Sequence, residues 1–258
     1  MSIAVATLQL AACSLLVSPD DYVGTRPLDS LWAYYRFDGD TVDSSGSAHD
    51  GILAGATATL DGSGVIGTAL TCVNAGDKVK ISDDFAPGTS SFTLAMFYRI
   101  EMTGGGIAAH SLNTFIVKGS AFEDSTNDQP GFGIGYNDTT QNVAGFIRDN
   151  VSAHAWVSTH AAASSELPLR DGRFHHTALV VDRDTARVSL YVDGTLHDFT
   201  GIPIGYGSVD ATAIAQLCSE GTVNNPSIQM DGALDEVMIF TRALTPAEVA
   251  GLAARTHD

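Results

Sequence analysis

The fold is decided by the stretch from Arg173 to Phe199, RFHHTALVVDRDTARVSLYVDGTLHDF. Its first half reads as a strand whose two faces are both apolar or aromatic, which is typical of a strand covered on both sides. Asp182 to Ala186 supplies a polar turn, and residues 188–192 alternate along a second strand. Asp193-Gly194 then favours a type I′ turn, because both central residues of that turn need positive φ. We therefore predict a β-hairpin in the middle of an all-β domain.

This hairpin resembles the central hairpin of laminin-G-like domains, which belong to the concanavalin A-like jelly-roll group. Two further stretches resemble the same family: WAYYRFDGDTVDSSGSAHDG, from Trp32 to Gly51, and MDGALDEVMIFTRALTPAEV, from Met230 to Val249. The resemblance implies a β-sandwich of two antiparallel sheets with a short C-terminal helix. It implies much less about function, because this fold carries lectins, adhesion modules and enzymes alike.

The C-terminal helix is also predicted by the residues themselves. Thr245 is a suitable N-cap, Pro246 a suitable first helical residue, and Glu248 the return partner of a capping box. An apolar stripe follows in the next two turns, which indicates a short helix with one packed side.

The composition limits the class of protein. A chain of 258 residues with this pattern forms one sandwich domain, which we place at residues 31–258. Its net charge of −17, from 13 Lys and Arg against 30 Asp and Glu, excludes nucleic acid and anionic membrane surfaces as expected partners. The excess of acids serves solubility or, in a more specific interpretation, holds a divalent cation.

The N-terminal segment, residues 1–13, is apolar, and LAAC at its end resembles a bacterial lipoprotein signal-peptidase box in which Cys13 is acylated. That resemblance implies an exported protein, either at the cell surface as an outer-membrane lipoprotein or extracellular, touching a membrane only through its lipid. Against it, no Lys or Arg precedes the apolar stretch. The alternative is a retained apolar arm that docks on a neighbouring copy. Residues 14–30 form a polar linker in either case.

Two further cysteines, Cys72 and Cys218, lie in strand-like runs. In an exported domain they are expected to form a disulfide that closes a long loop, which stabilises the fold by roughly 4–5 kcal/mol in the chain-entropy model. The alternative is two separate buried thiols.

The resemblance implies a structural calcium site. In laminin-G-like domains of this type, the strand that ends in FDG pairs with the strand that carries DEV, so their acids come together. Asp38 and Asp235 are implicated first, with Asp40, Asp43 or loop carbonyls completing the shell of oxygen ligands that Ca²⁺ requires. The alternative is that these acids cap turns.

Four side chains are candidates for contact with a sugar across the concave face of the sandwich. Aromatic rings can stack on sugar rings, and Arg can add hydrogen bonds. The alternative for each is a place in the core or on the sheet surface without a ligand. The candidates are Tyr98, Tyr136, Arg148 and Trp156.

Catalysis is disfavoured. Glycosidases on this sandwich carry two carboxylates on one strand as E-x-D-x-x-E, and the sequence has no such string. Asp235 and Glu236 are adjacent, so they point to opposite sides of a strand. The pair His175-His176 matches positions that the family uses for packing and hydrogen bonding.

The sequence therefore predicts a non-catalytic, calcium-stabilised extracellular binding or adhesion module whose ligand is a carbohydrate or a glycoprotein. The alternative is a structural or assembly subunit of a surface fibre or virion that self-associates through the apolar N-terminal arm. A glycoside hydrolase or lyase is the third and least favoured class.

Overall fold

A computed structural model gives the structure of the chain. It describes residues 29–55, 58–74, 76–82, 84–101, 112–119, 129–137, 140–150, 154–158, 169–219 and 230–255. The predictions for Cys13, for the signal or arm and for most of the linker lie outside these residues.

The described residues form fifteen strands and one helix. Their order confirms the predicted all-β class. The elements are β1 (Leu31–Tyr35), β2 (Gly51–Ala54), β3 (Thr59–Ser63), β4 (Thr68–Cys72), β5 (Lys78–Ile81), β6 (Phe92–Ile100), β7 (Leu112–Gly119), β8 (Gly131–Asn137), β9 (Asn142–Arg148), β10 (His154–Ser158), β11 (His175–Asp182), β12 (Arg187–Val192), β13 (Thr195–Gly201), β14 (Gln216–Leu217), β15 (Gly232–Phe240) and α1 (Pro246–Ala253).

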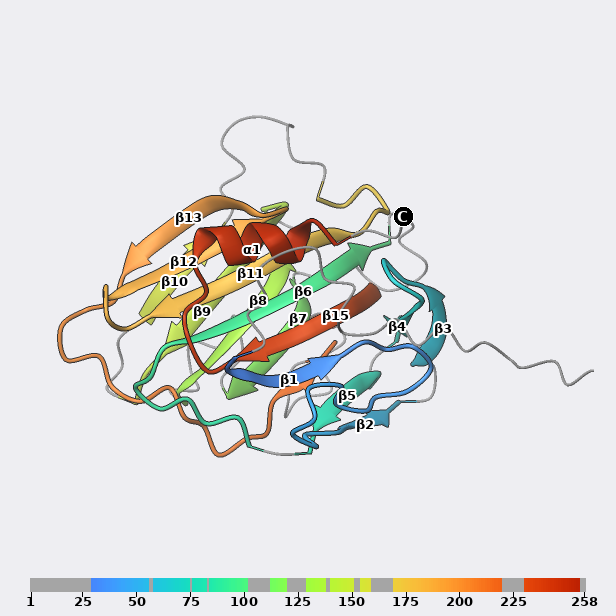
Figure 1. Cartoon of the computed structure of the whole chain (residues 1–258), viewed down its shortest axis with the longest axis horizontal. Helices are drawn as coiled ribbons and strands as arrows, with labels where there is room; N and C mark the ends of the chain where they lie inside the picture. Colours follow the sequence, from blue (N-terminus) through green and yellow to red (C-terminus); the bar gives the residue numbers. More distant parts are fainter. Residues whose placement is uncertain are drawn as a thin grey trace, which may run out of the picture.

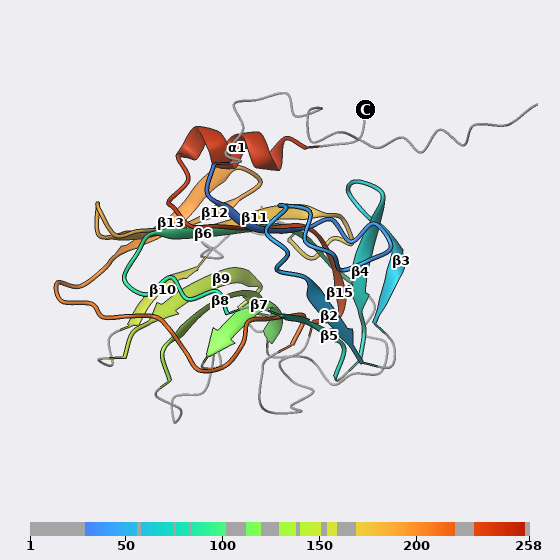
Figure 2. The ribbon, with the colours of Figure 1, turned by 60° about the horizontal axis from the view of Figure 1, so that its bottom comes forward.

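The strands make two antiparallel sheets. The eight-stranded sheet has the order β13-β12-β11-β6-β15-β4-β3, with β1 also paired to β15, and the seven-stranded sheet has the order β10-β9-β8-β7-β14-β5-β2. The sheets lie one above the other, and α1 lies on the far side of the eight-stranded sheet (Figures 1 and 2). The main core fills the space between the sheets with side chains such as Phe92, Phe115 and Phe132.

The predicted hairpin is confirmed. β11 and β12 pair in register from Thr177 opposite Val192 to Asp182 opposite Arg187. The loop between β12 and β13 has only two residues, Asp193 with φ 47° and Gly194 with φ 74°, as a type I′ turn requires.

β11 is covered on both faces, as its sequence indicates. Leu179 and Val181 point into the core between the sheets, whereas Ala178 and Val180 lie in a second apolar cluster with Val249 of α1 and its neighbours. The predicted capping box is present too, because Thr245 and Glu248 exchange hydrogen bonds at the start of the helix.

β15 shares one of its edges between two neighbours. β4 pairs with residues 232–234, and β1 pairs with residues 237–240. Asp235 and Glu236 lie between these two stretches. A bulge shifts the register against β6 between Asp235 and Met238, and Glu236 takes a positive φ of 51°. The bulge marks the point where one partner strand ends and the other begins.

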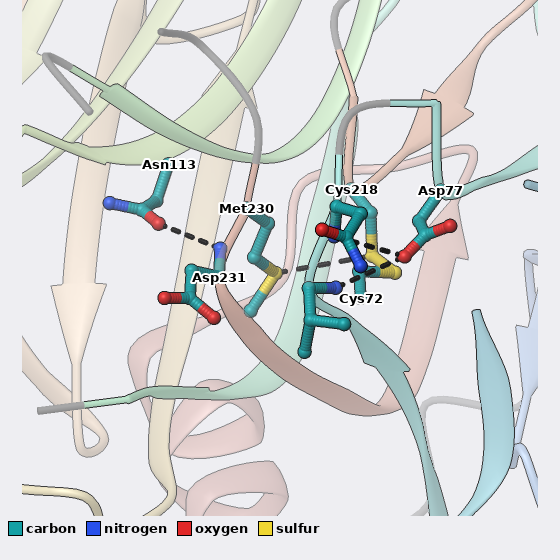
Figure 3. Close-up of a disulfide and its surroundings, with 8 residues drawn as sticks. Cys72, Asp77, Asn113, Cys218, Met230 and Asp231 are labelled. Carbon is teal, nitrogen blue, oxygen red and sulfur yellow. Dashed lines mark hydrogen bonds between the residues drawn. A yellow bond between two sulfur atoms is a disulfide. The ribbon is translucent and has the colours of Figure 1, made fainter. Parts of the chain in front are cut away.

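The predicted disulfide is confirmed. Cys72 ends β4 in the eight-stranded sheet and Cys218 directly follows β14 in the seven-stranded sheet, so their bond crosses the sandwich with Cα atoms 6.3 Å apart. Figure 3 shows its surroundings, in which Met230 contacts Cys218 and the Asp77 carboxylate accepts hydrogen bonds from the backbone N–H groups of Val73 and Asn74. No helix among the described residues has the length and apolar character needed to cross a membrane.

Removing the disulfide should destabilise the fold without changing its topology. The bond closes a loop with a sequence separation of 146. We expect the double variant Cys72→Ala/Cys218→Ala to lose about 2–5 kcal/mol of unfolding free energy, measured by urea denaturation. A strong reductant should shift the midpoint of the wild type but leave the double variant unchanged. Equal midpoints for the two proteins under oxidising conditions would show that the bond does not stabilise the chain.

Candidate ligand-binding face

The outer face of the seven-stranded sheet is the side that points away from the eight-stranded sheet. β8 contributes only glycine to it, because Phe132, Ile134 and Tyr136 point into the core and the residues at positions 131, 133 and 135 are all Gly. At these three positions the outer face is therefore formed by main-chain atoms without side chains.

β9 supplies the side chains beside this glycine row. Its outward residues are Ala144, Phe146 and Arg148, which lie directly opposite the glycines of β8. Val117 of β7 lies opposite Gly133 from the other side. Val117, Ala144 and Phe146 form a buried apolar cluster that is separate from the core between the sheets.

Toward β5 and β2 the outer face becomes polar and more open. Gln216 of β14 follows Val117 in register, and Lys80 of β5 follows Gln216. Ile52 of the edge strand β2 ends the row and is 57% exposed. Lys78 lies two residues before Lys80 and so points to the same side. The outer face is thus apolar and buried at β7 and β9, and it is more exposed at β5 and β2, where it carries the two lysine ammonium groups.

The four predicted sugar-contacting residues divide between two places. Tyr98 and Tyr136 are in the core between the sheets, where the Tyr98 ring stacks on Phe115 at 4.4 Å between centroids. The prediction is wrong for both, because a ring enclosed between two sheets is out of reach of a ligand in solution. Arg148 is on the outer face. Trp156 lies opposite Phe146 in backbone register, and its side chain is outside the described residues.

Sequence reasoning missed Gln216, Ile52 and the lysine pair as parts of this face. A signal was available in GFGIGYN at 131–137, where glycine alternates with large residues and so assigns one face of the strand to the core. Nothing local in the sequence indicates that β5, β14 and β7 are neighbours.

A second exposed aromatic surface lies on the other sheet. Phe199 of the edge strand β13 is 58% exposed, and the Arg187 guanidinium lies 3.7 Å from the centre of its ring. Phe199 stands opposite Ser189 and Leu196 opposite Tyr191, so both share the side of the sheet that carries α1. This surface is the competing candidate for a ligand.

The predicted calcium ligand Asp43 is surrounded by hydrogen-bond donors. Its carboxylate accepts bonds from the backbone N–H groups of Tyr34, Ser45 and His49 at 2.8–3.0 Å and from the Ser45 hydroxyl at 2.8 Å. Burial opposes ionisation of Asp43, but these bonds outweigh it and lower the pKa of the carboxyl. Asp43 therefore organises the loop after β1.

Asp38 and Asp235 converge on one loop, residues 64–68. Asp235 is fully buried and accepts hydrogen bonds from the backbone N–H groups of Val65 at 2.7 Å and Ile66 at 3.1 Å. Asp38 accepts one from the N–H of Thr68 at 3.1 Å and forms an ion pair with Arg36 at 2.7 Å. The two acids are therefore brought together as expected, but around backbone donors.

The Glu236 side chain contacts different partners from the Asp235 side chain. It accepts a hydrogen bond from the Tyr34 hydroxyl and forms an ion pair with Arg255, which lies just beyond α1. Burial raises the pKa of Glu236, and the Arg255 charge opposes that shift. Burial together with the Glu236 charge raises the pKa of Asp235 to about 8. The pair joins β15 to β1, to the loop before β4 and to the C-terminal segment.

These acids do not fit the calcium site that the resemblance implies. A cation needs several oxygen acceptors pointing at one place, whereas Asp43, Asp38 and Asp235 point at N–H, hydroxyl and guanidinium donors. Asp40 accepts a hydrogen bond from the N–H of Val42 at 3.1 Å, which is an Asx turn. Among the described residues, no three His, Cys, Asp or Glu side chains are grouped so that they could hold a metal ion. Calcium binding by the chain stays a prediction.

His175 bridges two carboxylates beside the type I′ turn. Its Nδ1 lies 2.9 Å from Asp193 and its Nε2 3.3 Å from Asp171. The hydrogen bond with Asp193 raises the pKa of His175 against the effect of burial. The neighbouring His176 is buried, which lowers its pKa to about 4. Both histidines therefore have structural roles, as the family's use of these positions implies.

The sequence matches the Concanavalin A-like lectin/glucanases superfamily over residues 73–250. The chain belongs to this family. The sheet order and the C-terminal helix agree with that membership, and they confirm the predicted jelly-roll sandwich. No match was found among curated protein sequences.

Solved structures that resemble the chain include two toxin binding domains and one domain of an arabinanase. The binding domain of Paraclostridial Mosquitocidal Protein 1 has a TM-score of 0.67 and 17% identity, over 88% of this chain and 52% of that one. Domain 4 of an extracellular arabinanase from Geobacillus stearothermophilus, in complex with arabinotriose, has a TM-score of 0.60 and 21% identity, over 87% and 98%. The binding domain of botulinum neurotoxin DC in complex with SialylT has a TM-score of 0.61 and 12% identity, over 88% and 51%.

At these identities the likeness shows the fold alone. The chain spans about half the length of the toxin domains and nearly all of the arabinanase domain. Activities and partners of the larger toxins do not follow for this chain from the shared sandwich.

Chelation tests the four acids as calcium ligands. Because these carboxylates already accept hydrogen bonds from the protein, we expect the wild type to have the same melting temperature in EDTA and in millimolar calcium. Asp235→Asn should lower the melting temperature equally in both conditions, since it removes an acceptor from the loop at 65–66 and no ion. A wild type that melts higher in calcium, with the difference lost in Asp235→Asn, would restore the calcium site.

The His175 bridge should make stability depend on pH. A histidine whose pKa is raised in the folded state contributes stability that is fully present below its unfolded pKa, near 6.5, and is lost as the pH rises through the folded pKa. We expect His175→Gln to lower the unfolding free energy more at about pH 5.5 than at about pH 9, measured in urea. Arg173→Gln, an exposed neighbour, is the control. An equal loss at both values would exclude a charged bridge.

Proposed function

We propose that the chain is a non-catalytic binding module for carbohydrate and that the outer face of the seven-stranded sheet is its ligand site. One observation carries the choice of face. α1 covers the outside of the eight-stranded sheet, while no described helix or strand packs over the outside of the seven-stranded one (Figure 2). Val117, Ala144 and Phe146 at one end of this face are buried, so the part that a ligand can reach is the open end at β5 and β2.

The chemistry of that face suits a sugar. Sugars combine apolar ring faces with many hydroxyl groups, so they match surfaces that mix apolar and hydrogen-bonding side chains. The open end of the outer face mixes Ile52 with Gln216, Lys78 and Lys80. The complexes of the arabinanase domain with arabinotriose and of the neurotoxin domain with SialylT support carbohydrate as the ligand class.

The acid pair in β15 supports the absence of catalysis. A glycosidase needs two carboxylates facing one cleft with room for the scissile bond. Asp235 and Glu236 are 0% and 1% exposed and are held by the loop at 65–66 and by Tyr34 with Arg255. Neither carboxylate is in reach of a substrate.

Two exposed residues on opposite sheets allow a matched test of the face. Ile52 and Phe199 lie on the edge strands β2 and β13 and are 57% and 58% exposed. We expect Ile52→Ala to weaken glycan binding about three- to tenfold, because part of its apolar contact with the ligand is lost. Phe199→Ala should leave binding unchanged. Both substitutions are on the surface and should change stability by no more than about 0.5 kcal/mol.

The measurement is a glycan array, followed by calorimetry on the glycans that bind. Loss of binding in Phe199→Ala alone would move the site to the competing surface on the eight-stranded sheet. A blank array with a folded wild type would contradict carbohydrate binding, and release of reducing sugar from any bound glycan would contradict a non-catalytic role.

A further inference from the structure

The two sheets differ sharply in charge. None of the seven strands of the seven-stranded sheet contains an Asp or a Glu, although acids make up 30 of the 258 residues of the chain. The strands of the eight-stranded sheet contain five: Asp61, Asp182, Asp198, Asp235 and Glu236.

The basic residues show the opposite distribution. The chain has only three lysines, and all three lie on the seven-stranded sheet, Lys78 and Lys80 on β5 and Lys118 on β7. Arg148 on β9 adds a fourth positive charge to the same sheet. In a chain of net charge −17, the strands of this sheet therefore carry positively charged side chains and no negatively charged ones.

Lys118 has a structural role. Its side chain is 0% exposed, and its ammonium group donates to the carbonyl of Phe85 at 2.8 Å and pairs with Asp84. The Asp84 carboxylate therefore neutralises the charge of Lys118, and Lys118 is not available to a ligand.

Lys78 and Lys80 differ from Lys118. Val79 and Ile81 point into the core, so the two lysines point to the outer face, beside each other on one strand. Neither has an ion-pair partner among the described residues. Burial lowers the pKa of Lys78, and the charge of Lys80 lowers it further, so the two ammonium groups repel one another.

We propose that the outer face selects acidic carbohydrate and that Lys78 and Lys80 together bind the carboxylate of a uronic or sialic acid unit. A carboxylate between the two lysines relieves their repulsion and gains charge-assisted hydrogen bonds. Ile52, opposite Lys80 on β2, and Gln216, opposite Lys80 on β14, then flank the sugar ring. This inference rests on the proposed function and adds the class of sugar.

The charge of the whole protein makes this pair necessary for an acidic ligand. At a net charge of −17 the protein repels an anionic polymer at long range, so binding depends on a local positive site. Nucleic acid is the competing anionic partner. It is disfavoured because its binding sites neutralise many phosphates in a row, whereas this face offers two ammonium groups that have no ion-pair partner in the described part of the chain.

The test uses the full chain and matched pairs of glycans that differ only in the acid group. The pairs are polygalacturonate with its methyl ester and sialyllactose with lactose, and a single-stranded oligonucleotide is added. The variant Lys78→Gln/Lys80→Gln is compared with Arg173→Gln/Arg187→Gln, which removes two positive charges from β12 and from the segment before β11. Melting curves show that each variant is folded.

We expect the wild type to bind at least one acidic glycan about tenfold or more tightly than its neutral partner, with affinity falling as salt rises. The lysine variant should lose about tenfold for the acidic form and keep its affinity for the neutral form, and the arginine variant should match the wild type.

Equal affinity for acidic and neutral forms in wild type and lysine variant would overturn the acid preference and leave carbohydrate binding in place. No affinity for any glycan would overturn both proposals. Oligonucleotide binding that the lysine variant loses, with no glycan bound, would assign the pair to nucleic acid instead.

Discussion

The junction at Asp235 and Glu236, where the bulge of β15 begins, is the constraint on which the rest of the eight-stranded sheet depends. A strand has two edges, and β15 gives one of them wholly to β6 and divides the other between β4 and β1. At the division, two buried carboxylates replace the missing ladder partners. Burying two acids side by side is costly, and it is tolerated because each one accepts hydrogen bonds from a different segment. Loss of either acid would leave a buried donor unpaired, which costs more than the lost bond itself contributed.

The arrangement of the two outer faces follows from this junction. Glu236 forms an ion pair with Arg255, which lies two residues after the end of α1. This ion pair fastens the C-terminal end of the helix to the eight-stranded sheet. The helix buries Ala178, Val180 and Tyr191 there. The disulfide from Cys72 to Cys218 ties the other half of the junction, β4, to the opposite sheet. One outer face is thus covered by α1, and no described helix or strand packs over the other.

Local features of the sequence predicted local structure well. The Asp193-Gly194 turn, the capping box at Thr245 and the two-faced strand β11 depend on residues that are near one another in the chain. The roles of the acids could not be predicted in this way, because the donors that occupy Asp235 lie about 170 positions earlier. The same limit explains the error at Tyr98. Alternation predicts which residues of β6 share a face, but both faces of that strand are apolar, so the pattern alone cannot assign the face toward the other sheet.

The distribution of charge connects the fold to the function. Within the described residues, acids such as Asp43, Asp182 and Asp193 are used by the loops, because carboxylates pair well with the free N–H groups that turns expose. That use gives these acids hydrogen-bond donors within the chain itself. It does not explain why seven strands carry no acid at all, since outward positions of a strand accept Asp and Glu readily, as Asp182 on β11 shows. Packing does not require Lys78 and Lys80 to lie together, and neither forms an ion pair with another described residue. The proposed acidic ligand would account for a sheet without negative charge in a protein whose net charge is −17.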